Sequence, residues 1–156
     1  MVRSKIFLCA HGTAQDRESN NITVFSIIEQ FNVTTFPLAY PFITVFGCFE
    51  KDPKDKRKYQ VQLKVLNNEN EILAVPSELN FLEFPRARLI FQIGGIIIPE
   101  PGLLKFILYV NNKVLCDYIV DVVPKAQADV KVRSETSEGK TGALPEPFKV
   151  LSGEDT

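Results

Sequence analysis

Short apolar segments recur along the chain, separated by proline, glycine and asparagine. The clearest is Tyr59–Leu66, in which the apolar residues Tyr59, Val61, Leu63 and Val65 alternate with the polar residues Gln60, Gln62 and Lys64. This period of two predicts a half-exposed antiparallel strand. The segments predicted as strands are Lys5–Ala10, Ile22–Val33, Phe42–Glu50, Tyr59–Leu66, Ile72–Val75, Leu79–Phe84, Arg88–Ile98, Leu103–Val110 and Lys113–Val122.

Turn signals lie between these segments. Asn111-Asn112 separates two alternating runs by only two residues, and asparagine tolerates the left-handed backbone of a type I′ turn, so a tight hairpin is predicted. Proline and glycine predict another turn at Pro99–Gly102. The polar stretch Thr13–Asn21 is expected to be a loop. Phe36-Pro37 and Tyr40-Pro41 are expected to break the chain, because proline has no N–H to donate.

Two segments are apolar on both faces. Ile22–Val33 is therefore expected to be a central strand or to bend partway, and a short helix over Val24–Phe31 remains an alternative. Arg88–Ile98 is expected to be a central strand covered on both sides, or one covered by a second subunit. Gly94-Gly95 predicts a bulge or a sharp bend within it.

The spacing of the segments predicts the fold class. Roughly seven to nine strands without intervening helical patterns indicate an all-β protein, an antiparallel β-sandwich that is loosely immunoglobulin-like. The tryptophan and paired cysteines of true immunoglobulin domains are missing. The sandwich is expected over residues 1–124, and residues 125–156 are polar enough to predict a flexible tail. Its apolar island Leu144–Leu151 is either part of a disordered linker or an added strand on a sheet edge.

Composition narrows the class of protein. The chain has 156 residues, is 45% apolar and 24% charged, and has a net charge of −1. These values predict one globular domain without a general attraction for nucleic acid or anionic membranes. The apolar run Ile6–Ala10 is too short for the core of a signal peptide, and no segment has the length of a membrane span. Three widely spaced cysteines do not form a disulfide framework, so a cytoplasmic protein is expected.

The sequence gives little support for a metal site or a catalytic site. Cys9, His11, Cys48 and Cys116 have the makeup of a Cys₃His zinc site, but the paired spacing of structural zinc sites is absent. Buried free thiols explain the three cysteines more simply. His11 is the only histidine, and no nucleophile motif accompanies it. The sequence therefore predicts a protein without a metal, a cofactor or enzymatic activity.

The main charge run is KDPKDKRKY, residues 51–59. Clustered cations in such a loop could contact phosphate groups, but interleaved aspartates weaken their field and only one aromatic residue is at hand for stacking. A solvated loop is the expected structure, and nucleic acid is an unlikely partner. The cations of this loop are Lys51, Lys54, Lys56, Arg57 and Lys58.

Two stretches carry a resemblance to a known family. They are FLCAHGTAQDRESNNITVFSII (residues 7–28) and IPEPGLLKFILYVNNKVL (residues 98–115). Together they resemble a family of small uncharacterised bacterial proteins, which share an opening cysteine-containing strand, a proline-rich break and a final hairpin. The resemblance covers most of residues 5–122. It implies a β-sandwich fold and a bacterial or phage-like source, and it carries over no catalytic residues.

Two functional hypotheses follow. The first is a non-enzymatic, cytoplasmic protein-interaction or self-assembly module, with a homo-oligomer expected because the Arg88–Ile98 strand needs a cover. The alternative is a small-ligand or carbohydrate sensor that binds at loops on one end of the sandwich. The candidate binding residues are His11, Asp16, Tyr40, Arg86 and Glu100.

Overall fold

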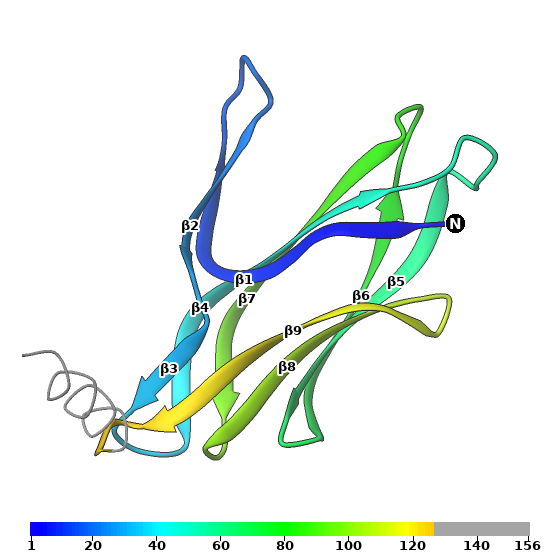
Figure 1. Cartoon of the computed structure of the whole chain (residues 1–156). Helices are drawn as coiled ribbons and strands as arrows, with labels where there is room; N and C mark the ends of the chain where they lie inside the picture. The colour runs from blue at the N-terminus through cyan, green and yellow to red at the C-terminus, as the bar shows by residue number, and fades with distance from the viewer. Residues whose placement is uncertain (127–156) are drawn as a thin grey trace, which may run out of the picture.

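A computed structural model describes residues 1–126, which form nine strands in two sheets packed face to face (Figure 1). The predicted flexibility of the tail and the island at 144–151 fall outside the described residues. No helix among residues 1–126 is long and apolar enough to cross a membrane. The strands are β1 (Arg3–Gln15), β2 (Ile22–Ile27), β3 (Gln30–Val33), β4 (Leu38–Glu50), β5 (Lys58–Asn67), β6 (Asn70–Asn80), β7 (Arg86–Ile98), β8 (Gly102–Val110) and β9 (Lys113–Pro124).

The strand order confirms the predicted sandwich. One sheet, sheet A, has the order β2-β1-β4-β7, and the other, sheet B, has the order β3-β9-β8-β5-β6. All pairs are antiparallel except β3 with β9. In sheet A, β4 and β7 are neighbours, as strands B and E are in immunoglobulin domains. In sheet B, β5, β8 and β9 lie side by side, as strands C, F and G do in those domains. The fold is therefore immunoglobulin-like in its topology as well as in its layers.

The core lies between the two sheets. Phe49 from sheet A and Leu63 and Phe106 from sheet B are fully buried there. The odd positions of β5 face inward, as the alternation of Tyr59–Leu66 predicts. Burying a large apolar side chain contributes about 1.5–3 kcal/mol, so this layer is the main source of stability.

The first strand is longer than predicted. It pairs with β4 as far as Ala10 and then leaves β4 to pair with β2 up to Gln15. The predicted loop from Thr13 is therefore wrong at its start, because these residues are held by hydrogen bonding to a neighbouring strand. The outer half of β1 and β2 form a hairpin, named the β1–β2 arm, that stands out from the body in Figure 1.

The segment Ile22–Val33 bends partway, which is one of its two predicted forms. Ser26 has a positive φ of 50°, and the N–H of Ile28 donates to the carbonyl oxygen of Cys9 at 2.8 Å. The chain thus passes from β2 in sheet A to β3 in sheet B, and no helix forms. The segment Ile22–Val33 has apolar residues on both faces because its first half belongs to sheet A and its second half belongs to sheet B.

The predicted break at Tyr40-Pro41 is wrong, since β4 runs through it. The register pairs Tyr40 with Ile96 and Phe42 with Gly94, and it leaves Pro41 without a partner. A proline is tolerated there because its missing N–H removes no ladder hydrogen bond. Pro76 is likewise part of β6, which is an edge strand.

The predicted central position of Arg88–Ile98 is also wrong. β7 is an edge strand of sheet A, with one face in the core and the other exposed. Its exposed face carries Ile90 and Ile97, so apolar residues on both faces do not here mean burial on both faces. The predicted bend is present at Gly94-Gly95, where φ of Gly95 is 69° and the alternation of buried and exposed residues changes phase.

Candidate functional site

A groove of about 950 Å³ lies between the tip of the β1–β2 arm and the start of β7. Its floor comes from the outer face of sheet A, and one wall is the turn between β6 and β7. Apolar side chains and a few charged ones line it. The lining residues are Gln15, Asn20, Ile22, Cys48, Glu50, Asn80, Phe81, Leu82, Phe84, Pro85, Arg86, Ala87, Arg88 and Ile90.

The turn between β6 and β7, residues 81–85, presents apolar side chains to the groove. Leu82 is 58% exposed and Phe84 is 65% exposed. The turn is fixed at its base, because Phe81 is buried in the core and the Asn80 side chain accepts a hydrogen bond from the Leu82 N–H at 2.9 Å. The Phe84 N–H donates to the Phe81 carbonyl at 2.9 Å. Two large apolar side chains are therefore held toward solvent by a well-bonded backbone.

Charged groups occupy the other side of the groove. Glu50 receives the Lys5 ammonium at 2.9 Å, and the hydrogen bond from Lys5 lowers the pKa of this carboxyl group. The Arg86 Nε lies 3.8 Å from the second Glu50 oxygen. Arg88 donates from Nη1 to the Asn20 carbonyl oxygen at 2.7 Å, which ties the arm tip to β7. Of the residues that the structure describes, none places a carboxylate within 4 Å of Arg88.

Within residues 1–126 no strand pairs with the outer side of β7, which is named the free edge of β7. It is 13 residues long and contains no proline, although Pro85 and Pro99 flank it. The other edge strands of the two sheets are shorter, and β6, the next longest, contains Pro76. Natural sheets usually protect long edges with proline, charge or a cover. β7 is therefore the longest of the described edges, and its residues 86–93 form a proline-free row of backbone donors and acceptors before the bend at Gly94-Gly95.

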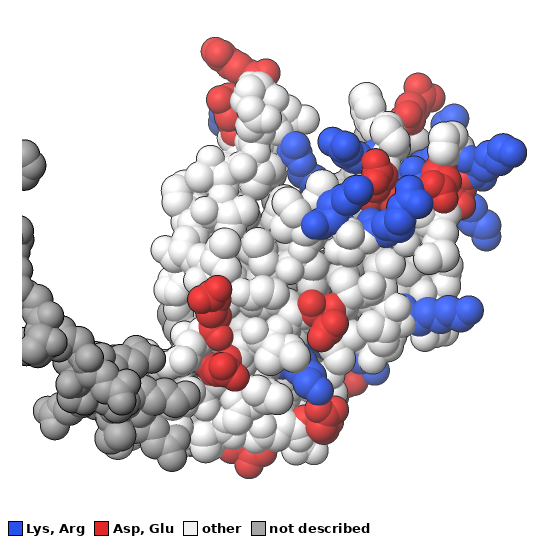
Figure 2. All heavy atoms as spheres, in the orientation of Figure 1, with Lys and Arg blue, Asp and Glu red and all other residues white. Residues whose placement is uncertain are grey.

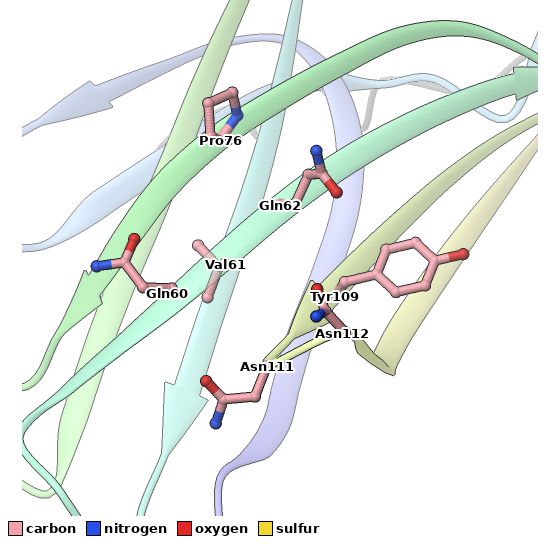
Figure 3. A pocket seen from close by; sticks show the side chains of 7 residues that line it. All are labelled: Gln60, Val61, Gln62, Pro76, Tyr109, Asn111 and Asn112. Atoms are coloured by element: carbon pink, nitrogen blue, oxygen red, sulfur yellow. The ribbon is translucent and has the colours of Figure 1, made fainter.

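A second, smaller hollow of about 470 Å³ lies on the outer face of sheet B. Its lining is mostly amides, with the Tyr109 ring beside them, and Figure 3 shows these side chains spread along β5, β6 and the β8–β9 hairpin. Such groups suit a ligand rich in hydroxyls. The lining residues are Gln60, Val61, Gln62, Pro76, Tyr109, Asn111 and Asn112.

The five predicted binding residues do not form one cluster. His11 and Tyr40 do meet, with the Tyr40 hydroxyl 3.1 Å from His11 Nε2 and the rings edge to face. Arg86 lies in the groove, as described above. Asp16 accepts the Glu18 N–H within the arm turn, which lowers the pKa of its carboxyl group. Glu100 accepts a hydrogen bond from the Asn68 side chain at 3.0 Å in the turn before β8.

The basic loop at residues 51–58 satisfies part of its own charge. Lys51 is buried, and its ammonium donates to the backbone carbonyls of Asp52 and Asp55 at 3.4 Å each. The Asp52 carboxylate accepts a hydrogen bond from Arg3 at 2.8 Å. These contacts direct the Lys51 ammonium inward, away from an external phosphate, whereas the Asp52 carboxylate stays 44% exposed beside Arg3.

The tentative zinc set of Cys9, His11, Cys48 and Cys116 does not assemble. Across residues 1–126 no three His, Cys, Asp or Glu side chains gather closely enough to hold a metal ion. Cys9 lies in the core, Cys48 lines the groove and Cys116 lies on β9 of sheet B. Burial raises the pKa of Cys9 to about 12 and that of Cys116 to about 11.

The thiols should differ in reactivity. At pH 8 we expect a thiol reagent to modify one cysteine per native chain, Cys48, and all three after unfolding. With the pKa values given above, only about one in 1,000 molecules has Cys116 ionised and about one in 10,000 has Cys9 ionised. The rate at Cys116 should rise about tenfold per pH unit up to pH 11.

The measurement is a colorimetric thiol titration with and without denaturant. Cys48→Ser is the control, and it should leave no rapidly reacting thiol in the native protein. Rapid reaction of two thiols in the native wild type would contradict the buried position of Cys9 or the raised pKa of Cys116.

Comparisons with known proteins point to one family. The family described as "Family of unknown function (DUF6941)" matches residues 5–123. No curated protein matches the chain in sequence. Among solved structures, an immunoglobulin-like protein from Pseudomonas aeruginosa is similar, with 10% identity, a TM-score of 0.40, and coverage of 78% of this chain and 96% of that chain.

Proposed function

We propose a function for this chain, which belongs to the DUF6941 family of unknown function, from its groove and the strand beside it. The protein is a binding module, not an enzyme, and it holds an extended segment of a partner polypeptide against the free edge of β7. The observation that carries the proposal is the combination of a long proline-free edge with exposed apolar side chains at its start.

The physical basis is the addition of a strand to a sheet. A peptide that pairs with β7 satisfies backbone groups of the edge, and these hydrogen bonds supply affinity for extended segments in general. Selectivity comes from pockets for alternate side chains. The groove supplies such a pocket, because Leu82, Phe84 and Ile90 border it from the turn and from β7.

A polypeptide fits this site better than a small molecule does. Ligand pockets for small molecules bury most of the ligand's surface. The groove is instead lined by the tip of the arm, by the β6–β7 turn and by the edge strand β7. Exposed apolar side chains grouped in this way are typical of protein-binding surfaces.

The test uses random twelve-residue peptides displayed on phage and selected on the immobilised full-length protein. We expect the enriched peptides to bind wild type and to bind Ile90→Lys about tenfold more weakly, since a lysine at the edge blocks close strand pairing and removes an apolar contact. Hydrogen exchange should show slower exchange of β7 amides when a peptide is bound.

The matched control is Ile119→Lys. Ile119 is 44% exposed and Ile90 is 41% exposed, but Ile119 is on β9, which has neighbours on both sides in sheet B. Binding should be unchanged in this control. Equal loss in both variants, or protection of a different strand, would overturn the proposal. A concentration-dependent dimer with protected β7 amides in the absence of peptide would overturn it in favour of a second copy of the chain.

A second candidate function is the binding of a small, hydroxyl-rich ligand such as a carbohydrate. The amide-lined hollow beside Tyr109 favours it (Figure 3). The Lys64 ammonium lies 5.7 Å from the centre of the Tyr109 ring and already covers part of it. A titration of the protein with mono- and disaccharides, followed by tyrosine fluorescence, tests this candidate. A fluorescence change that is lost in Tyr109→Ala would support it. The absence of any change, or a change that persists in Tyr109→Ala, would dismiss it.

A further inference from the structure

We infer that the partner segment carries two acidic side chains at alternate positions, which face Arg86 and Arg88. An aliphatic side chain two positions before the first acidic one lies beside Ile90. This inference rests on the proposed function and names the chemistry of the partner. It follows from three features of the groove: the spacing of the two arginines, the state of their guanidinium groups and the charge around them.

The spacing comes from the strand. Arg86, Arg88 and Ile90 are successive exposed positions on one face of β7. Residues two apart in a strand lie about 6.6–7 Å apart on the same face, and an added strand has the same repeat. Side chains of the partner at every second position therefore fall opposite these three residues.

The guanidinium groups are only partly engaged. Arg88 uses Nη1 for the Asn20 carbonyl, and within the described part of the chain it has no carboxylate partner. Arg86 approaches Glu50 through Nε at 3.8 Å, a distance too long for a strong hydrogen bond. The nearer partner of Glu50 is Lys5 at 2.9 Å. Both arginines thus keep donors for a carboxylate from outside, and arginine is suited to a two-point contact.

The charges around the two arginines also favour an acidic partner. Arg3 is paired with Asp52 at 2.8 Å, which leaves Lys5 and Arg86 to share the single carboxylate of Glu50, so one cation is in excess at this point. Figure 2 shows most of the visible positive side chains gathered, with a few negative ones among them, at the end of the molecule where the N-terminus and the 51–58 loop lie, and other negative ones on the lower half and at the tip of the arm. An acidic segment is attracted to this end, and a basic one is repelled.

The direction of the partner gives a sequence rule. Added in antiparallel fashion to β7, the partner reads aliphatic, any, acidic, any, acidic from its N-terminus to its C-terminus. The aliphatic side chain then lies opposite Ile90, and the two carboxylates lie opposite Arg88 and Arg86. Antiparallel pairing is slightly more stable per residue than parallel pairing, which favours this direction.

The experiment compares the enriched peptides with glutamine analogues on full-length wild type, Arg86→Gln, Arg88→Gln and Arg88→Lys. We expect glutamate-to-glutamine changes and each arginine-to-glutamine change to weaken binding about three- to fivefold. Arg88→Lys should recover part of the loss, because it keeps the charge and loses the two-point contact. Raising the salt concentration should weaken the acidic peptides and leave the glutamine analogues unchanged.

The controls separate binding from folding. Lys113→Gln removes the same charge from the exposed start of β9 and should not change binding. Among the described residues Arg86 has no hydrogen bond or ion pair with the arm, whereas Arg88→Gln also removes the bond to Asn20. Hydrogen exchange of residues 16–21 therefore reports whether the arm has moved.

The outcomes distinguish the two proposals. Enriched peptides that lack acidic residues, or glutamine analogues that bind equally well while β7 amides are protected, would overturn this inference and leave the edge-binding function in place. Enriched peptides that are insensitive to Ile90→Lys would overturn both.

Discussion

Replacing Phe106 with alanine should lower the free energy of unfolding by about 3–5 kcal/mol, which is a large part of the total stability of a domain of this size. Phe106 is completely buried on β8, and its register neighbours in the sheet are Val65 and Tyr118. The loss combines the transfer free energy of the ring with the cavity that it leaves. Neighbouring strands fix the surrounding backbone, so the site has little room to collapse.

Equilibrium unfolding in urea measures this change. The chain has no tryptophan and four tyrosines, so tyrosine fluorescence and circular dichroism are the suitable signals. Phe84→Ala serves as the control, because its ring is mostly exposed in the groove and its removal should cost less than about 0.5 kcal/mol. A cost below 1 kcal/mol for Phe106→Ala would contradict the position of this ring at the centre of the core.

Gly102→Ala should destabilise the protein by about 3 kcal/mol, because it combines backbone strain with lost hydrogen bonds. Gly102 has a φ of 131°, and a Cβ at this position would lie 2.0 Å from the Asn68 side-chain oxygen. That oxygen accepts the Leu103 N–H at 2.9 Å, and the Asn68 Nδ2 donates to the Pro101 carbonyl at 2.7 Å. The added methyl group would displace the side chain that joins the β5–β6 turn to the β7–β8 turn.

Thermal unfolding tests this expectation against Gly12→Ala. A Cβ at Gly12 meets nothing within 4 Å and Gly12 has no positive φ, so its replacement should change stability by less than about 0.5 kcal/mol. The melting temperature should fall by roughly 10 °C for Gly102→Ala and stay nearly constant for the control. Similar melting temperatures for the two variants would show that Asn68 can move at little cost.

Local patterns predicted the strands well where one face is buried and the other is solvated. The alternation of Tyr59–Leu66 and the two asparagines at 111 and 112 predicted β5 and the β8–β9 hairpin, whose turn residues have φ values of 49° and 64°. The position of β7 was not predictable in the same way. Its apolar residues on both faces are common to a central strand and to an edge strand with an unpaired outer face. Only the order of the strands distinguishes the two.

The candidate site was predicted in part. Arg86 was selected from the sequence and lies in the groove, whereas Arg88, Leu82 and Phe84 were not selected. The two apolar residues were missed because Leu79–Phe84 was predicted as a strand; that prediction is wrong, since β6 ends at Asn80 and Phe81–Pro85 is a turn with three large apolar side chains. The meeting of Arg88 with Asn20 had no sequence signal, since it depends on how the β1–β2 arm bends toward β7.

The parallel pairing of β3 with β9 affects how the chain reaches its native state. Gln30 lies opposite Asp121, so most of the described chain separates the two partners. On a ribosome, β3 would be synthesised early and would remain without its neighbour until β9 emerged. Such distant pairing slows folding, because a long loop must close before the contacts form. The last strand therefore controls when the first part of sheet B can be completed, and chains that terminate before β9 would leave β3 available for misassembly.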